Sequence, residues 1–382
     1  MQMFENYSSH WMDGDLEQFE AVVARFFREQ VEPNDLKWRE AKRTGRDVWR
    51  KAGELGIILP DVPEQYGGSG GTPAHMAVVI REQARVGDAA FGVMLSHIVG
   101  HYILAFGTEA QKLRWLPGIA SGEVICSIAM TEPGTGSDLQ AIRCRADRVG
   151  DAYVVNGAKT FITNGQQSDL VLVVARTGAE GAKGISLILV ETATPGFRRG
   201  KCLDKIGIEG ADTSEMYFDD CSVPADNVLG GVEGQGFYQL MGQLPYERAA
   251  IAISAQGAME RALALTLDYV KERKAFGKAI VDFQNTRFEL ADIKATVLAC
   301  RTFCDHVIEK WVDGTLDPTL ASMAKFWLTD RQVEVIDRCL QFFGGYGYMR
   351  EYPIARMYTD ARVQRIYGGA NEIQRELVGR SL

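Results

Sequence analysis

The chain has 382 residues, which at roughly 100–200 residues per domain allows two or three domains. Hydrophobic residues make up 46% and charged residues 24%, as in ordinary soluble globular proteins. The net charge of −8 argues against nucleic-acid binding, which needs a basic surface, and no apolar run reaches the ~18 residues of a membrane span.

Helical periodicity dominates residues 1–122. Apolar side chains in Leu16–Phe27 recur at intervals of three and four, and Asp13 stands before them as an N-cap. Further along, Thr108 and Gln111 form the pattern of a capping box, in which each side chain satisfies the other's backbone N–H. The sequence therefore predicts a helical N-terminal domain.

Residues 123–232 have a different character, with short apolar or β-branched runs between turn residues. The predicted strands are Val124–Met130, Tyr153–Val155, Leu170–Val174, Ile185–Val190 and Met216–Phe218. The predicted turns are Asn156-Gly157, Asn164-Gly165, Pro195-Gly196 and Asp219-Asp220. No helix-length pattern intervenes, so we predict a central antiparallel β domain rather than βαβ units.

Long helical patterns return in residues 233–382. The first covers residues 236–273, the second covers residues 282–311, and a third begins with Asp317 as N-cap and Pro318 at the first helical position. Two shorter helical segments follow. Long helices with short connections predict a four-helix-type bundle, so the expected fold class is a multidomain α+β protein.

The seven cysteines are scattered, odd in number and form no CxxC pair, which suits reduced thiols in a cytosol-like compartment. Residues 1–15 are polar and acidic and have the features of neither a signal peptide nor an Arg-rich transit peptide. We therefore expect a cytoplasmic protein, or one of the mitochondrial matrix if a targeting segment has been removed.

Two pairs of residues have the spacing of one helical turn. His97 and His101 could bind zinc at this spacing, but no acidic residue or cysteine stands beside them in the sequence. We interpret them as polar residues on a helix face. Cys300 and Cys304 are interpreted as small buried hydrophobic residues, so no metal site is predicted.

The common nucleotide-binding motifs GxGxxG and GxxxxGK[ST] are missing, and hydrolase motifs such as GxSxG and HExxH are missing too. Two loops remain as candidate cofactor sites. Residues 131–138 offer glycines, amides and hydroxyls that suit phosphate or flavin edges, and an ordinary surface turn is the alternative. Residues 342–348 place glycines beside aromatic side chains, which suits either a flat ring or a helix C-cap with core aromatics.

Five segments together resemble the acyl-CoA dehydrogenase family, in an order and spacing that agree over nearly the whole chain. These segments are residues 130–138, 156–165, 272–278, 341–348 and 362–373. The resemblance implies a helical domain, a β domain and a helical bundle, as the periodicity does. It also implies non-covalent FAD, a homotetramer, an acyl-CoA substrate and an electron-transferring flavoprotein as electron acceptor.

The resemblance assigns two groups of residues to FAD. One group would face the isoalloxazine ring and ribityl chain: Met130, Thr131, Gly136, Ser137, Phe161 and Thr163. The other would reach the FAD of a neighbouring subunit, partly near its adenosine half: Arg273, Phe276, Gln284, Gln341 and Gly345. The guanidinium fork of Arg273 suits a pyrophosphate, and a solvated charge at a helix end is the alternative.

The catalytic position departs from the commonest pattern of the family. Many members carry a glutamate directly after the tyrosine that matches Tyr367, but here that residue is Gly368. Ala370 also replaces a threonine whose hydroxyl often touches FAD. A smaller branch, similar to the long-chain and isovaleryl types, carries its base on the first long helix of the bundle, where this chain has Glu247.

Glu247 is therefore the expected base, and the closest resemblance is to the long-chain type, which shares the Gly368-Gly369 pair. A surface ion pair with Arg248 or Arg261 is the alternative role for Glu247. Pro245 lacks an N–H and should kink the helix so that Glu247 is aimed at the substrate. The residues expected at the substrate are Ser137, Tyr246, Arg248, Tyr367 and Gly369.

The implied reaction converts a fatty-acyl-CoA thioester to the trans-2-enoyl-CoA, with a proton leaving Cα and a hydride passing from Cβ to flavin N5. The carboxylate must be desolvated, and the thioester oxygen needs hydrogen-bond donors. The resemblance implies that these donors are a flavin ribityl hydroxyl and the backbone N–H of Gly368. Extra room at the glycine favours a long or branched acyl group. The alternatives are a dehydrogenase of carrier-protein-bound acyl or prolyl thioesters and a flavin monooxygenase on the same fold.

Overall fold

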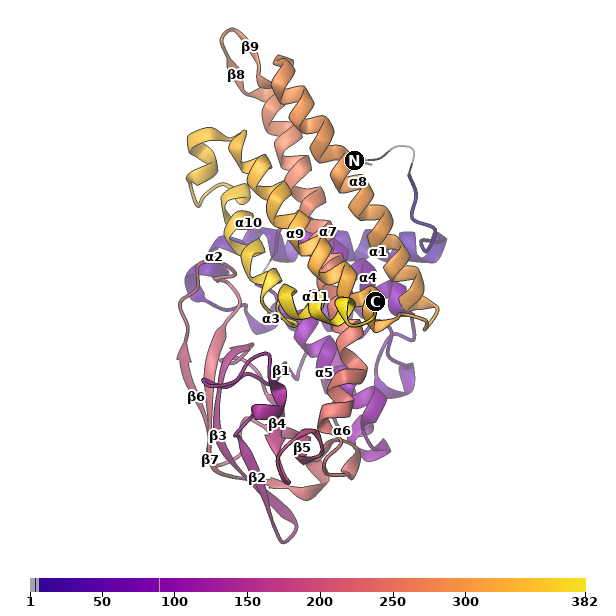
Figure 1. The fold of residues 1–382 in the computed structure, drawn as a ribbon, viewed down its shortest axis with the longest axis vertical. Helices are drawn as coiled ribbons and strands as arrows, with labels where there is room; N and C mark the ends of the chain where they lie inside the picture. The colour runs from indigo at the N-terminus through magenta and orange to yellow at the C-terminus, as the bar shows by residue number, and fades with distance from the viewer. Residues whose placement is uncertain (1–3, 5–6, 89) are drawn as a thin grey trace.

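The computed structural model describes residue 4, residues 7–88 and residues 90–382, so part of the first stretch of the predicted N-terminal domain lies outside it. Figure 1 shows an elongated molecule with the β-sheet towards one end and the long C-terminal helices running to the other, where a small hairpin projects. Some of the N-terminal helices lie across the middle, and the others lie beside the sheet. This arrangement confirms the predicted fold class.

The described part of the N-terminal region contains six α-helices. They are α1 Gly14–Phe26, α2 Asp35–Ala41, α3 Arg46–Glu54, α4 Pro73–Arg85, α5 Val93–Phe106 and α6 Glu109–Ala120. Asp13 accepts a hydrogen bond from the N–H of Leu16 at 2.9 Å, which confirms the N-cap. Thr108 and Gln111 form the predicted capping box at 3.0 and 3.3 Å. Helix α4 packs against both α1 and the first bundle helix, so one hydrophobic core joins the two regions.

A seven-stranded sheet forms the central part. Its strands are β1 Cys126–Ala129, β2 Arg145–Val149, β3 Ala152–Thr163, β4 Leu170–Arg176, β5 Ile185–Glu191, β6 Phe197–Cys202 and β7 Thr213–Pro224. Their order is β1-β4-β2-β3-β7-β6, with β5 also paired to β4. Most pairs are antiparallel, but β1 runs parallel to β4, and β2 meets β4 in parallel. The prediction of a purely antiparallel sheet was wrong for these two pairs. The chain passes from β1 to β4 through the β2–β3 hairpin, so β1 and β4 are parallel although no helix connects them.

Two of the four predicted turns lie inside strands instead. Asn156-Gly157 and Asp219-Asp220 face each other in the middle of β3 and β7, where the pairing register shifts. The N–H of Asp220 donates to the Asn156 side chain at 2.8 Å, so the side chains satisfy backbone groups that the bulge leaves unpaired. The turns at Asn164-Gly165 and Pro195-Gly196 are confirmed, as they end β3 and precede β6.

The C-terminal region contains five helices and a hairpin. The helices are α7 Gly236–Glu272, α8 Gln284–Val312, α9 Pro318–Gln341, α10 Pro353–Ala361 and α11 Asn371–Gly379, and the hairpin strands are β8 Lys274–Ala275 and β9 Lys278–Ala279. Asp317 caps α9 by accepting from the N–H of Leu320 at 3.0 Å. Helix α7 is one continuous helix with Pro245 inside it, so the proline does not end or divide the helix. Cys300 and Cys304 are buried as predicted. No described helix has the length and apolarity to cross a membrane.

Candidate active site

The Glu247 side chain lies on α7 and faces α5. Its side chain is 7% exposed, and Tyr102 of α5 donates a hydrogen bond to Oε1 at 2.9 Å. Burial raises the pKa of Glu247, while the hydrogen bond from Tyr102 and the charge of Arg248 oppose that rise. The surface ion pair considered from the sequence is therefore wrong, and a desolvated carboxylate of this kind suits a general base.

Gly368 lies next to the same part of α7. Its φ is +64°, and a Cβ built on it would lie 2.3 Å from Cδ1 of Ile251, which stands one helical turn after Glu247. Ile251 is thus a neighbour both of Glu247, the expected base, and of Gly368, where many related proteins carry their glutamate. The same contact corrects the expectation of extra room, because the Ile251 side chain already occupies the space beside Gly368.

A buried lysine fastens the diglycine segment to α9. Lys325 Nζ donates to the carbonyl of Gly369 and to the side chain of Asn371, both at 2.8 Å. Burial, with the charge of Arg248, lowers the pKa of Lys325 to about 8. Sequence reasoning missed Lys325, although a lone lysine among the alanines and leucines of one helix face was a visible signal.

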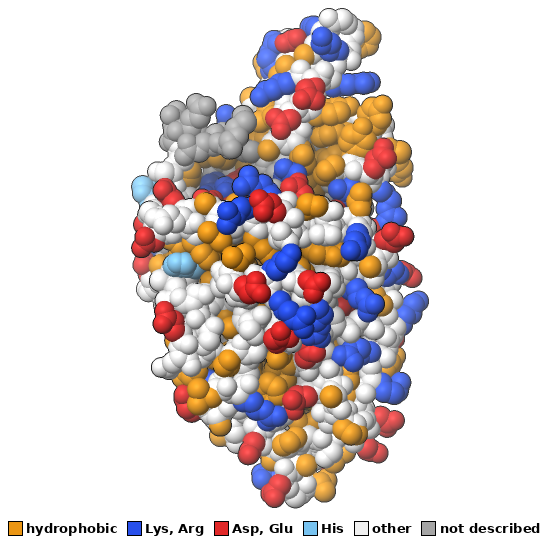
Figure 2. Space-filling view, turned by 180° about the vertical axis from the view of Figure 1, so that it is seen from behind, with side chains coloured by type: hydrophobic (Ala, Val, Ile, Leu, Met, Phe, Trp, Pro, Cys, Tyr) orange, Lys and Arg blue, Asp and Glu red, His pale blue; other side chains and the backbone are white. Residues whose placement is uncertain are grey.

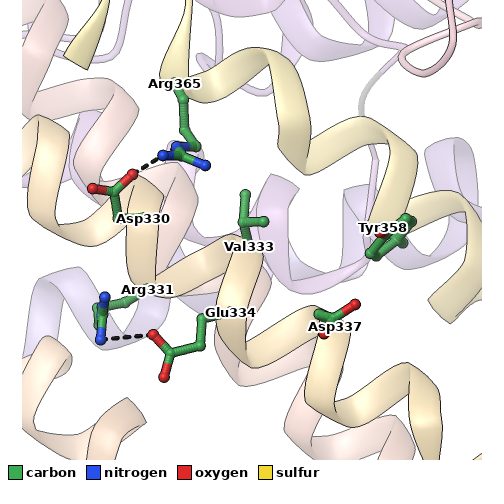
Figure 3. A pocket seen from close by; sticks show the side chains of 7 residues that line it. All are labelled: Asp330, Arg331, Val333, Glu334, Asp337, Tyr358 and Arg365. Carbon is green, nitrogen blue, oxygen red and sulfur yellow. Dashed lines mark ion pairs between the residues drawn. The ribbon is translucent and has the colours of Figure 1, made fainter. Parts of the chain in front are cut away.

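Asp330, also on α9, holds both flanks of the same segment. It forms ion pairs with Arg365 at 2.6 Å and with Arg375, and it accepts a hydrogen bond from Asn371 at 3.1 Å. Figure 3 shows Arg365 reaching Asp330 at the wall of a surface hollow of about 420 Å³. The hollow is lined by Asp330, Arg331, Val333, Glu334, Asp337, Tyr358 and Arg365, and none of these is a predicted site residue.

A buried ion pair with β3 holds the loop of residues 131–138 in place. Lys159 of β3 donates to the carbonyl of Met130 and to the Glu132 carboxylate, both at 2.9 Å. The outer side of the loop is open, since a Cβ built on Gly134 or Gly136 would meet nothing within 4 Å. A rigid loop with an open glycine backbone fits the close approach of a cofactor.

Phe161 combines a strained backbone with an exposed ring. It has a φ of +60° at a register shift of β3, and its side chain is 65% exposed. Left-handed backbone at a bulky residue is strained, and such strain tends to be kept at functional sites. The N–H of Thr160, next to Phe161, donates to the carbonyl of Thr131 at 2.9 Å, which joins β3 to the loop. Thr131 and Thr163 are half-buried, and Ser137 is exposed on the loop. This surface fits the isoalloxazine role.

The second group of FAD candidates lies at the far end of the bundle, away from β1 (Figure 1). Phe276 forms the tip of the β8–β9 hairpin with a φ of +52° and is 95% exposed. Arg273 lies with its guanidinium 5.8 Å from the Tyr346 ring, which brings the hairpin together with the glycine-aromatic loop of Gly345. Figure 2 shows hydrophobic side chains gathered near this end. Gln284 and Gln341 are exposed there too. One chain therefore does not bring the two FAD groups together.

The predicted substrate residues are divided between the interior and the surface. Tyr246 and Arg248 are buried, and Arg248 donates to the hydroxyl of Ser322 at 3.2 Å. Tyr367 is 43% exposed, and Gly369 is half-buried at the diglycine segment.

His97 and His101 lie on one face of α5, as predicted, and they share a carboxylate partner there. His97 is buried, and Nε2 atoms of His97 and His101 lie 2.7 and 3.1 Å from one oxygen of Asp61. The hydroxyl of Tyr246 contacts the other ring nitrogen of His97. The acidic partner comes from a loop 36 residues before His97, so nothing near the histidines in the sequence indicated it. The three side chains place ligand atoms within 4.8 Å of one another, and Asp61 Oδ2 is buried without a hydrogen-bond partner among the described residues.

The described residues thus offer a buried carboxylate on α7 near the diglycine segment and, in the β domain, an open glycine loop and an exposed aromatic ring. Family models for the acyl-CoA dehydrogenase N-terminal, middle and C-terminal domains match residues 13–123, 127–221 and 234–382. The chain belongs to the acyl-CoA dehydrogenase family.

Individual relatives agree with this assignment. The mitochondrial long-chain specific acyl-CoA dehydrogenase of Mus musculus is 45% identical over 368 residues, which are 95% of this chain and 85% of the mouse protein. The crystal structure of an acyl-CoA dehydrogenase from Geobacillus kaustophilus has a TM-score of 0.95 at 43% identity and covers 98% of this chain and 99% of its own. A glutaryl-CoA dehydrogenase from Mycobacterium smegmatis in complex with FADH2 has a TM-score of 0.91 at 27% identity, covering 97% and 95%.

Proposed function

We propose that the protein oxidises a fatty-acyl-CoA thioester to the trans-2-enoyl-CoA, with FAD as cofactor and Glu247 as the base. The observation that carries this proposal is the buried Glu247 carboxylate, whose neighbour Ile251 touches the position of Gly368. A carboxylate on α7 can then serve the reaction centre that other family members serve from the position of Gly368.

The chain's own residues support the proton transfer. Oε1 of Glu247 is held by Tyr102, and no hydrogen bond reaches Oε2 from any residue that the structure describes, so Oε2 is free to accept the α-proton. The N–H of Gly368 is the expected donor to the thioester oxygen, and Lys325 holds the adjoining carbonyl of Gly369 in place. Bound FAD, held by the loop of residues 131–138 and by Phe161, supplies the acceptor for the hydride of Cβ.

The finer parts of the proposal concern substrate and partners. Similarity to the mouse long-chain enzyme favours a long fatty-acyl chain on CoA. Phe276 and Arg273 are exposed and lie far from the flavin surface of their own chain, which supports an oligomer in which a neighbour completes each FAD site. The proposed oligomer is the homotetramer that the family resemblance implies. An electron-transferring flavoprotein is the proposed electron acceptor.

An anaerobic titration tests the function. Purified holoenzyme is mixed with acyl-CoA thioesters of increasing chain length, flavin absorbance is followed, and the enoyl product is identified by mass spectrometry. We expect bleaching and enoyl-CoA with long-chain thioesters. Bleaching only with carrier-protein-bound acyl or prolyl groups would favour the carrier-protein alternative, and oxygenated products formed in air would favour the monooxygenase.

A further inference from the structure

We infer that Tyr102 is the positioning residue of the base: its hydroxyl holds one oxygen of the Glu247 carboxylate and leaves the other free for the substrate. This inference rests on the proposed function, because it requires Glu247 to act as the base. Tyr102 itself touches no reacting atom, so its effect on the reaction passes through Glu247.

The contact is short, buried and exclusive. Tyr102 is fully buried on α5, and its hydroxyl donates to Glu247 Oε1 at 2.9 Å across 145 residues of sequence. The hydroxyl makes no second hydrogen bond within the described part of the chain. The ring is fixed by packing 6.3 Å from Phe106, one turn further along α5. A donor with one acceptor and a fixed ring restricts the carboxylate to one orientation.

Helix α5 holds the neighbouring residue of α7 as well. The hydroxyl of Tyr246 contacts the ring of His97, and His97 is anchored in turn by Asp61 at 2.7 Å. Two consecutive residues of α7, Tyr246 and Glu247, are thus tied to side chains of one helix. The base-bearing turn cannot shift along α5 without breaking both contacts.

The same helix also supports the strands that lead to the flavin surface. The hydroxyl of Ser96 on α5 accepts from the N–H of Cys126 at the start of β1, at 3.1 Å. Asn164, directly after β3, donates to the carbonyl of Gly92 at the start of α5, at 3.2 Å. Helix α5 therefore contacts both the helix that carries the base and the two strands next to the flavin surface, β1, which Met130 follows, and β3, which contains Phe161.

The hydrogen bond also has an electrostatic consequence. Tyr102 of α5 and Arg248 of α7 are the titratable groups that oppose the effect of burial on the pKa of Glu247. Burial and the Glu247 charge raise the pKa of Tyr102, which keeps the hydroxyl protonated and able to donate. Because a carboxylate accepts this bond more strongly than a neutral acid does, losing the donor must raise the pKa of Glu247 further.

Tyr102→Phe in the holoenzyme tests the inference. A hydrogen bond to a charged group is expected to shift the pH limb of anaerobic flavin reduction alkaline by about one pH unit, with about a tenfold slower rate below the limb and little change in KM. Tyr66→Phe is the matched control, since it removes a tyrosine hydroxyl that donates to a different glutamate, Glu109, at 3.0 Å. The control should keep both the rate and the pH limb.

A double variant separates positioning from a general structural role. If Tyr102 acts only through the base, Glu247→Gln with Tyr102→Phe should reduce no more slowly than Glu247→Gln alone. A further loss in the double variant, or an unchanged pH limb in Tyr102→Phe, would overturn the inference. Failure of the proposed function is distinguishable, because it shows as normal reduction by Glu247→Gln itself.

Discussion

Gly368→Ala adds one methyl group where the diglycine segment passes α7, and the structure allows its cost to be worked out. The φ of +64° disfavours any L side chain by about 1 kcal/mol. The added Cβ would also lie 2.3 Å from Cδ1 of Ile251, and overpacking of this kind costs about 1–3 kcal/mol. We therefore expect a loss of about 2–4 kcal/mol in the free energy of unfolding.

Two further variants divide this cost. Gly314→Ala isolates the backbone contribution, because Gly314 has a φ of +67° and open space around its Cβ position. Ile251→Val deletes Cδ1, so Gly368→Ala in that background should keep only the backbone cost of about 1 kcal/mol. Urea unfolding at fixed protein and FAD concentrations measures each difference. If Gly368→Ala costs no more than Gly314→Ala, or Ile251→Val gives no relief, the packing of the diglycine against α7 is wrong.

Three other outcomes follow from the site. Lys325→Met leaves the Gly369 carbonyl and the Asn371 side chain without their donor, so the free energy of unfolding in urea should fall by about 1–3 kcal/mol. Flavin reduction should also slow. An unchanged free energy of unfolding and an unchanged reduction rate would contradict the anchoring role of Lys325. Burial raises the pKa of Glu247 above its usual 4.5, so the folded protein loses stability as the pH rises through the raised pKa. Glu247→Gln should therefore exceed the parent in melting temperature by more at pH 8 than at pH 5. An equal difference at the two pH values would contradict the raised pKa. Phe276→Asp should weaken assembly and FAD retention, measured by light scattering and flavin absorbance, and an intact oligomer with full FAD would refute the proposed contact.

Local signals in the sequence predicted most of the fold. The caps at Asp13, Thr108 and Asp317 involve residues three positions apart, so the sequence shows both partners at once. Strands β2 and β6 were missed because they are short and rich in arginine, with mostly exposed side chains and no apolar run. The Asn156-Gly157 pair has the residue types of a turn, but a bulge uses the same residue types, so the sequence alone does not distinguish the two.

The candidate site was predictable only in part, for a physical reason. Resemblance to the family indicated Glu247 and Gly368, but the partners that hold them come from distant segments: Tyr102 on α5 and Lys325 on α9. Asp61 beside the histidines is a third case. Such contacts depend on how helices pack, and no periodicity or spacing within one segment encodes them.

The central claim is that Glu247 is the base, and stopped-flow flavin reduction of Glu247→Gln by the best acyl-CoA tests it most directly. The matched control is Glu233→Gln, which alters a glutamate bonded to Tyr153 on the sheet and should reduce normally. Glu247→Gln should keep its FAD and bind the thioester while its reduction rate falls by about 10²–10⁴-fold, the usual contribution of a positioned base. Reduction within a few-fold of the parent rate would show that the proton leaves Cα by another group.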